Sequence, residues 1–262
     1  MTNTLQLDRQ PNGVVLIRFN RPEALNAIDI DTMIAFRNAL NDLTQDEALR
    51  GVILTGAGER AFCSGGDLVE LRGRTSEDDA RYFTGIMTDA LHTLENLPVP
   101  VIAAINGYAL GGGSEIALAC DIRIIDENAR MGMVQINMGL TPGWGAGQRL
   151  LQIVGYSTAL ELLLKGEPLR ADALLALKLA NQKVPVGQAL QVALTFADAI
   201  AERPPKVVRG IKALLRAGVT LSDVQARQVE RDLFPPLWVD QPHLDAVEAF
   251  FKRRAAKRAD RE

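Results

Sequence analysis

A run of three glycines, Gly111-Gly112-Gly113, lies between the β-branched segment Val99–Ile105 and the apolar segment Ser114–Cys120. Glycine lacks a β-carbon, so such a loop lets the backbone approach a ligand closely. A helix that starts directly after the loop presents unpaired N–H groups and the positive end of its dipole. We therefore expect a strand, a tight loop and a helix whose N-terminus can meet a negatively charged oxygen.

Strands and helices are expected to alternate through the first half of the chain, which predicts an α/β fold. Pro11-Asn12-Gly13 is typical of a turn and predicts a hairpin. Apolar residues recur at helical spacing after Asp31, which we expect to be the N-cap of that helix. The other expected elements are the strands Thr4–Asp8, Val14–Phe19, Gly51–Thr55, Val99–Ile105 and Asp121–Ile125 and the helices Asp78–Leu94 and Ser114–Cys120.

The sequence changes character beyond Pro142, where the apolar residues follow helical spacing throughout. Pro204-Pro205 separates two of these helical stripes. We therefore predict an α/β core over residues 1–185 and a helical region over residues 186–262 that serves oligomerisation. The stripes consist of Leu190, Leu194, Ala197 and Ala201, of Val207, Val208, Ile211, Leu214 and Leu215, and of Leu244, Val247, Phe250 and Phe251.

Composition and charge indicate a soluble globular protein. Of the 262 residues, 47% are hydrophobic and 23% are charged, and the net charge of -3 provides no broad field for nucleic acid or an anionic membrane. The N-terminal residues lack the basic start and apolar run of a signal peptide, and the apolar stretches are too short to span a bilayer. We expect the two cysteines, Cys63 and Cys120, to be reduced thiols in a cytoplasmic protein.

Several kinds of catalytic site lack the residues they need. The chain has only two histidines, His92 and His243, so neither a Ser-His-Asp triad nor a histidine-rich metal site is expected. The segment Gly56–Ala61 matches the dinucleotide-binding pattern G-x-G-x-x-A. That pattern requires a helix to begin inside it, whereas Phe62-Cys63-Ser64 follows here, so we disfavour a dinucleotide site.

A second glycine-rich loop lies in Ala61–Leu68, and it too follows an apolar strand. The glycines of either loop could serve only tight packing. Two such loops together with the acidic Glu115 favour a site for a negative oxygen instead, which could belong to a phosphate, an enolate or a tetrahedral intermediate. Glu115 follows the three glycines. In apolar surroundings its pKa would be raised, although its charge could also simply cap the helix.

Four motifs in this order resemble the enoyl-CoA hydratase/isomerase (crotonase) superfamily, from Val14 to about Arg254. They are Asn20-Arg21-Pro22 with Ala24-Leu25-Asn26-Ala27, then AFCSGGDL, then NGYALGGGSEIALACD, then Gly139–Gly143 with Gln148-Arg149-Leu150. Locally, MGLTPGWG and Val229–Leu233 followed by Trp238 are also similar to the ethylmalonyl- and methylmalonyl-CoA decarboxylase branch.

The resemblance implies a spiral of ββα units with a C-terminal helical region, assembled as a trimer or a dimer of trimers. It implies an oxyanion hole made by the backbone N–H groups of Gly66 and Gly112, and an acyl-CoA thioester as substrate. No metal and no cofactor is implied, because CoA is part of the substrate. The residues that would bind the substrate are Ala24, Ser64, Gly65, Asp67, Leu68 and Gly111.

Glu115 matches the first catalytic glutamate of the hydratases, whereas Gln135 stands where they have a second glutamate that protonates the α-carbon. An amide cannot donate a proton of the required acidity. Either Glu115 performs both steps, or a water relay supplies the proton, or the reaction needs only one acid, as decarboxylation of an α-carboxyacyl-CoA does.

Hydration of an enoyl-CoA is the preferred function, and decarboxylation of a short α-carboxyacyl-CoA is the alternative. Isomerisation or thioester hydrolysis comes next, and a non-catalytic RNA-binding relative comes last because basic and aromatic stripes are missing. Trp144 either shortens the acyl pocket, which would favour small acyl chains, or packs in an interface.

Overall fold

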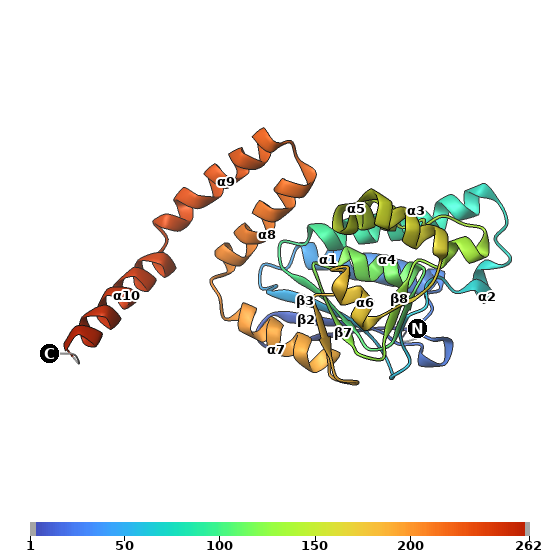
Figure 1. The fold of residues 1–262 in the computed structure, drawn as a ribbon, viewed down its shortest axis with the longest axis horizontal. Helices are drawn as coiled ribbons and strands as arrows, with labels where there is room; N and C mark the ends of the chain where they lie inside the picture. The colour runs from blue at the N-terminus through green and yellow to red at the C-terminus, as the bar shows by residue number, and fades with distance from the viewer. Residues whose placement is uncertain (1–3, 260–262) are drawn as a thin grey trace. The chain divides into compact units, whose positions relative to one another are not determined.

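The computed structural model describes residues 4–259, except for the side chains of residues 255 and 257–259. The chain divides into two units, one up to Ala201 and one from Glu202 onward. The division falls after the helix at residues 189–201, and the predicted boundary at residue 185 falls just before that helix. Figure 1 shows the course of the chain through both units.

The first unit is built on a main sheet of six strands in the order β1-β2-β3-β5-β7-β10. The predicted hairpin is confirmed, because β1 and β2 pair antiparallel, and the other strands are parallel. The strands are β1 (Leu5–Arg9), β2 (Val14–Phe19), β3 (Gly51–Gly56), β5 (Val101–Ile105), β7 (Ile122–Asp126) and β10 (Gln182–Val184).

A second, smaller sheet has the strand order β4-β6-β8-β9. Its strands are β4 (Ala61–Cys63), β6 (Tyr108–Leu110), β8 (Arg130–Gly132) and β9 (Leu169–Arg170). The chain passes from β3 to β4, from β5 to β6 and from β7 to β8, so each long strand is followed by a short strand in the other sheet. This repeat confirms the expected series of ββα units, and it places both glycine-rich loops at the ends of paired parallel strands, β4 and β6.

Helices cover both faces of the main sheet, which explains why its strands read as almost continuous apolar runs. Along β2, Val14 and Leu16 face a cluster that includes α7 (Ala189–Ala201), whereas Val15 and Ile17 face the larger core. This alternation follows from the two-residue period of a strand. The larger core contains the buried side chains of α1 (Ile30–Thr44), α3 (Glu77–Asn96), α4 (Gly112–Ala119) and α5 (Ala146–Lys165). Short helical segments complete the unit: η1 (Pro22–Ala24), α2 (Leu68–Leu71), η2 (Gln135–Met138) and α6 (Ala171–Ala176).

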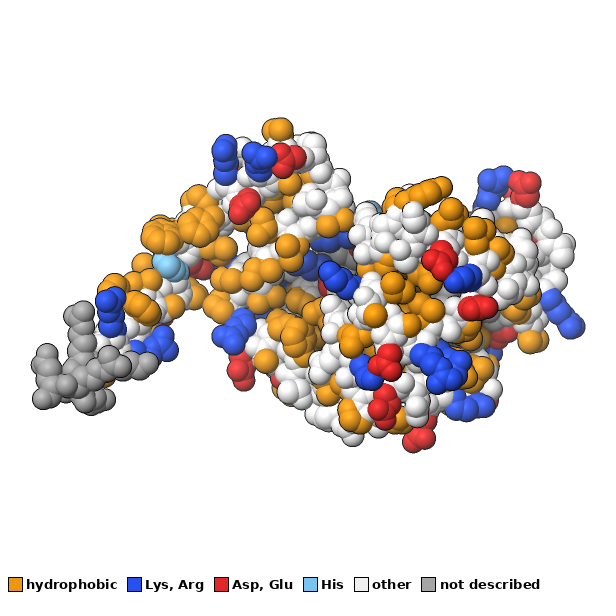
Figure 2. All heavy atoms as spheres, viewed as in Figure 1, with side chains coloured by type: hydrophobic (Ala, Val, Ile, Leu, Met, Phe, Trp, Pro, Cys, Tyr) orange, Lys and Arg blue, Asp and Glu red, His pale blue; other side chains and the backbone are white. Residues whose placement is uncertain are grey.

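The second unit consists of α8 (Pro205–Thr220), α9 (Asp223–Trp238) and α10 (Gln241–Ala259). Two of the predicted helical stripes lie in α8 and α10 and the third lies in α7 of the first unit, whereas no stripe predicted α9. Ser222 and Gln225 form a capping box that starts α9. Many apolar side chains of this unit are exposed, including Phe234, Trp238, Phe250 and Phe251, and Figure 2 shows apolar side chains gathered along it. Among the described residues, no helix combines the length and apolar character needed to cross a membrane.

The structure corrects the predicted N-cap of α1 and decides against a dinucleotide-binding loop after β3. Asp31 is not the N-cap of α1: Asp29 has the extended backbone of a cap and accepts a hydrogen bond from the Thr32 N–H, so the helix begins at Ile30. The segment after Gly56 continues into strand β4 at Ala61 and does not start a helix, which excludes the dinucleotide-binding geometry.

Candidate active site

The two glycine-rich loops meet at the ends of β4 and β6. Gly65 has φ +101°, and a β-carbon there would lie 3.0 Å from the Gly112 nitrogen. A β-carbon on Gly113 would overlap the carbonyl oxygen of Cys63. Glycine is therefore required at both positions for the loops to approach each other, and the packing explanation of the glycines holds for Gly65 and Gly113.

Gly66 and Gly112 provide two backbone N–H groups at this junction. Gly112 is the first residue of α4, and the first N–H groups of a helix have no partner within it. Within the described part of the chain, neither the Gly66 N–H nor the Gly112 N–H donates a hydrogen bond. Both residues are half-buried. Each of these N–H groups could therefore donate to a bound acceptor without displacing a bond of the fold.

The loop that carries Gly66 is fixed by bonds to the segment before α1. The Ile28 N–H donates to the Gly65 carbonyl at 2.8 Å, and the Asp67 N–H donates to the Ile28 carbonyl at 2.9 Å. Arg21 forms ion pairs with Asp67 at 2.8 Å and with Asp29 at 3.2 Å. Burial acts to raise the pKa of Asp67, but the Arg21 guanidinium and backbone N–H donors outweigh it and hold that pKa below its ordinary value.

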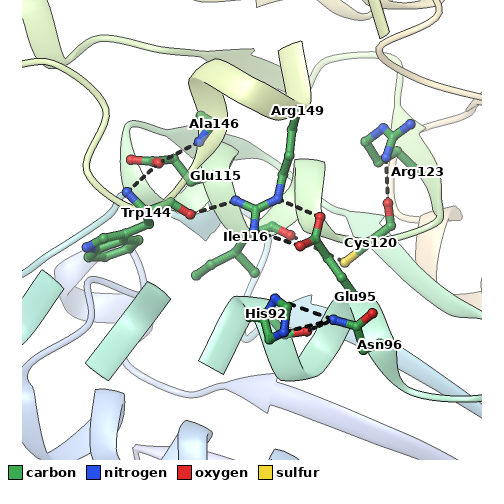
Figure 3. Close-up of polar contacts among 10 residues, drawn as sticks. All are labelled: His92, Glu95, Asn96, Glu115, Ile116, Cys120, Arg123, Trp144, Ala146 and Arg149. Atoms are coloured by element: carbon green, nitrogen blue, oxygen red, sulfur yellow. Dashed lines mark hydrogen bonds and ion pairs between the residues drawn. The ribbon is translucent and has the colours of Figure 1, made fainter. Parts of the chain in front are cut away.

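Glu115 lies in the first turn of α4 with 2% of its surface exposed. Its Oε2 accepts from the backbone N–H groups of Trp144 at 2.7 Å and Ala146 at 3.0 Å, as Figure 3 shows. Its Oε1 accepts from Gln135 Nε2 at 2.8 Å and from the Gly143 N–H at 3.3 Å. The carboxylate thus joins α4 to the loop that leads into α5.

The expected pKa shift of Glu115 is confirmed in direction. Burial raises its pKa above the ordinary value, and the hydrogen bonds from Ala146, Trp144, Gly143 and Gln135 oppose the shift without cancelling it. Because Ala146 is the first residue of α5, Glu115 caps that helix and not its own. The surroundings of Glu115 therefore favour the protonated carboxyl group more than water does.

Gln135, the first residue of η2, lies beside Glu115. A carboxylate can only accept hydrogen bonds, so the amide nitrogen of Gln135 must face it. This leaves the amide oxygen of Gln135 buried, with no hydrogen-bond partner in the described part of the chain. The pair therefore contains one titratable group, the Glu115 carboxyl, and one hydrogen-bond acceptor that is not used by the described residues, the Gln135 amide oxygen.

Trp144 is held in front of the glycine loops by both of its backbone groups. Its N–H donates to Glu115, and its carbonyl accepts from Arg149 Nη1 at 2.6 Å. Arg149 is itself paired with Glu95 of α3 at 2.8 and 3.1 Å (Figure 3). Arg149 belongs to one of the four motifs described above, but no nearby pattern indicates Glu95 as its partner, because 54 residues separate the two.

Trp144 is 6% exposed and packs within the core of the first unit. A β-carbon on Gly112 would lie 2.6 Å from Cη2 and 2.8 Å from Cε3 of the indole, and closer still to Cζ3. A β-carbon on Gly66 would lie 4.0 Å from Cζ2. The ring therefore lies across both glycines of the junction.

The residues expected to bind the rest of the substrate lie on adjoining segments. The Ser64 N–H donates to the carbonyl of Leu25, the residue after Ala24, at 3.1 Å. Leu68 is 57% exposed at the start of α2, and Gly111 caps α4 with φ +52°. These contacts bring together the segments that contain the predicted substrate-binding residues.

Neither histidine is part of this site. His92 is exposed on α3 and contacts Asn96, and His243 packs against Trp238 in the second unit. In the described part of the chain, no group of three or more metal-ligating side chains is close enough to hold a metal ion. Glu115, in contrast, is a buried carboxyl group that lies next to the glycine junction.

The sequence and the fold are both similar to those of known proteins. The family model for enoyl-CoA hydratase/isomerase matches residues 9–260. The short-chain-enoyl-CoA hydratase of Clostridium acetobutylicum is 35% identical, and the match covers 96% of each chain. The crotonyl-CoA hydratase of Syntrophomonas wolfei is 32% identical over 93% of each chain. The crystal structure of enoyl-CoA hydratase from Bacillus anthracis is similar with a TM-score of 0.90 and 33% identity, over 96% of this chain and 97% of that one.

Proposed function

The chain belongs to the enoyl-CoA hydratase/isomerase family and is an enzyme of the hydratase type, and we propose that it adds water across the 2,3-double bond of an enoyl-CoA thioester. The observation that carries this proposal is the buried Glu115 carboxylate, whose pKa is raised, beside two backbone N–H groups that have no partner among the residues that the structure describes. The residue roles that follow are part of the proposal.

The N–H groups of Gly66 and Gly112 bind the thioester oxygen. Addition of a nucleophile at C3 moves negative charge onto that oxygen and forms an enolate. Donors that are already in position are worth about 3 kcal/mol of barrier each. Two of them lower the barrier by about 6 kcal/mol, which is roughly four orders of magnitude in rate. This electrostatic contribution comes from the backbone alone, and we propose that no metal and no cofactor takes part.

Glu115 serves as the base and then as the acid. Its carboxylate takes a proton from the attacking water as the water oxygen bonds to C3, and it returns a proton to C2 as the enolate collapses. One water molecule is added and Glu115 ends as it began, so the atoms and charges balance. Gln135 cannot supply a proton, but its buried amide oxygen can accept a hydrogen bond from the water and orient it.

Hydration is favoured over the decarboxylation that the missing second glutamate left open. The relatives described above are named as hydratases, and the site retains a carboxylate that decarboxylation would need only for its final proton. No feature described for the site specifically supports isomerisation or RNA binding.

The test uses purified protein with crotonyl-CoA and, in parallel, methylmalonyl-CoA. Hydration removes the conjugation of crotonyl-CoA and bleaches its ultraviolet absorption, whereas decarboxylation releases CO2. We expect bleaching with crotonyl-CoA and no CO2 from methylmalonyl-CoA. Release of CO2 without bleaching would overturn the proposed function.

We also propose that the enzyme is a trimer or a dimer of trimers in the cytoplasm. The exposed aromatic side chains of the second unit support an assembly, because large apolar patches are uncommon on monomers. The two buried cysteines form no disulfide bond in the described part of the chain, which fits a reducing compartment. Sedimentation equilibrium should give three or six times the mass of one chain, and a monomer would refute the assembly.

A further inference from the structure

We infer that Trp144 is the residue that sets the acyl-chain length, and that its indole restricts the enzyme to short-chain enoyl thioesters. This inference rests on the proposed function for the identity of the substrate. Its structural basis is the position of the ring, which lies across Gly112 and Gly66, whose N–H groups donate no hydrogen bond within residues 4–259.

The path of the acyl chain follows from the groups that must touch it. The thioester oxygen lies at the two N–H groups, and C2 and C3 must lie within reach of the Glu115 carboxylate. Carbons beyond C3 must then continue past that carboxylate. The carboxylate is bonded to the backbone of Trp144 at 2.7 Å, and the ring of the same residue covers Gly112. The chain therefore meets the indole soon after C3.

The Gly66 side of the site is closed by apolar side chains as well. A β-carbon on Gly66 would lie 3.0 Å from Leu71 Cδ1 and 3.8 Å from Met33 Cε, in addition to its contact with Trp144. A longer chain that turned to this side would meet these side chains. The indole is the largest of these three groups, so its removal should open the most space.

Hydrogen bonds hold the backbone of Trp144 in place, and this restricts movement of its ring. The Trp144 N–H is bonded to Glu115, and its carbonyl to Arg149. Arg149 is held in turn by Glu95 through two hydrogen bonds, and its side chain is largely buried. Moving the ring out of the site would require these bonds to break or the largely buried indole to turn into solvent.

The first experiment compares kcat/KM of the wild type, Trp144→Phe and Trp144→Ala for trans-2-enoyl-CoA substrates of four, eight and ten carbons. A buried methylene group contributes about 0.8 kcal/mol, which is about fourfold in kcat/KM. The space of an indole can hold several such groups, so we expect Trp144→Ala to raise the ratio of ten-carbon to four-carbon kcat/KM at least tenfold, mainly through KM. Trp144→Phe should fall between. An unchanged ratio in a folded Trp144→Ala variant would overturn the inference.

The second experiment does not require turnover. Trp144 and Trp238 are the two tryptophans of the chain, and Trp238 is 56% exposed in the second unit. In Trp238→Phe, which should keep wild-type activity, all indole fluorescence comes from Trp144. Butyryl-CoA, which cannot be hydrated, should change the intensity or wavelength of this emission, and free CoA should not. An equal response to both probes would contradict contact between the acyl chain and Trp144.

The two experiments separate failure of the inference from failure of the proposed function. If no enoyl thioester is hydrated but the fluorescence responds to butyryl-CoA and not to CoA, the proposed reaction is wrong and the position of Trp144 at the acyl chain stands. If crotonyl-CoA is hydrated but the length ratio does not change, the reaction stands and the role of Trp144 is wrong. Should Trp144→Ala fail to fold, Trp144→Phe and the fluorescence response still decide the question.

Discussion

The substitution Glu115→Gln tests whether this carboxylate transfers protons or only holds the loop. A glutamine whose oxygen replaces Oε2 keeps the bonds from Trp144 and Ala146. Its NH2 group then replaces Oε1 and can donate to Gln135 once the Gln135 amide turns over. Only the 3.3 Å bond from the Gly143 N–H is lost. The structural damage is therefore limited to one backbone donor.

Asp126→Asn is a matched control. Asp126 is also 2% exposed, and it caps α7 by accepting from the backbone N–H groups of Gln188 and Ala189 through Oδ1 and of Gly187 through Oδ2. An asparagine whose oxygen replaces Oδ1 loses only the bond from Gly187. Each variant thus leaves one backbone N–H without its acceptor, but only Glu115 adjoins the proposed oxyanion hole.

Both variants should remain folded, and they should differ in turnover. A buried N–H left without a partner costs about 1–3 kcal/mol, so urea unfolding should show a loss in this range for Asp126→Asn. The loss should be smaller for Glu115→Gln, because removing a charge whose pKa is raised by burial recovers about 1.4 kcal/mol for each unit of the shift. Loss of the acid–base group should lower kcat for crotonyl-CoA by about 10²–10⁴-fold.

The assay is the bleaching of crotonyl-CoA at a temperature at which circular dichroism shows both variants to be folded. Asp126→Asn should retain wild-type turnover. If Glu115→Gln hydrates as fast as the wild type, Glu115 is not the acid–base group. If Asp126→Asn loses as much activity as Glu115→Gln, the loss reflects the stability of the fold and the reasoning fails.

Three further outcomes are expected. Burial raises the pKa of Glu115 in the folded protein. The stability that Glu115 contributes relative to Glu115→Gln should therefore be fully present below pH 4.5 and should fall as the pH rises through the folded pKa. Urea unfolding of both proteins across this pH range will show the change. Gln135→Glu should place a second carboxyl group at hydrogen-bond distance from the first, so the two should titrate as a coupled pair and the pH profile of kcat/KM should gain an ionisation; an unchanged profile would contradict their proximity. Gly112→Ala should force the Trp144 ring away, so turnover should fall and indole emission shift; unchanged emission would refute the packing.

The strands and glycine loops could be predicted because they follow from local rules. A strand that is buried on both faces must be apolar at nearly every position, as Val14–Phe19 is. A helix that starts at a close approach of two loops needs glycine, as at Gly113, where a β-carbon would overlap Cys63. These constraints act over a few residues, so the sequence displays them directly.

The N-cap of α1 shows where local reasoning stops. Asp29 and Asp31 are both capable caps by residue type. The choice is made by the segment that enters the helix, which the bridge between Ile28 and Gly66 fixes in an extended conformation. Since that bridge joins residues far apart in the chain, no nearby pattern indicates it. The same applies to the pair of Arg149 and Glu95, whose partners come from α5 and α3.

The least predictable feature is that Glu115 anchors the backbone of the residue that carries the indole. Its bonds to residues 143, 144 and 146 all come from main-chain N–H groups. Those donors remain whatever side chain occupies position 144. Substitution of Trp144 can therefore change the shape of the acyl site while the carboxylate keeps its three backbone donors. In the proposed roles, Glu115 transfers protons through its carboxylate and Trp144 selects chain length through its indole, so the two functions depend on different atoms of one bonded pair and should be separable by substitution.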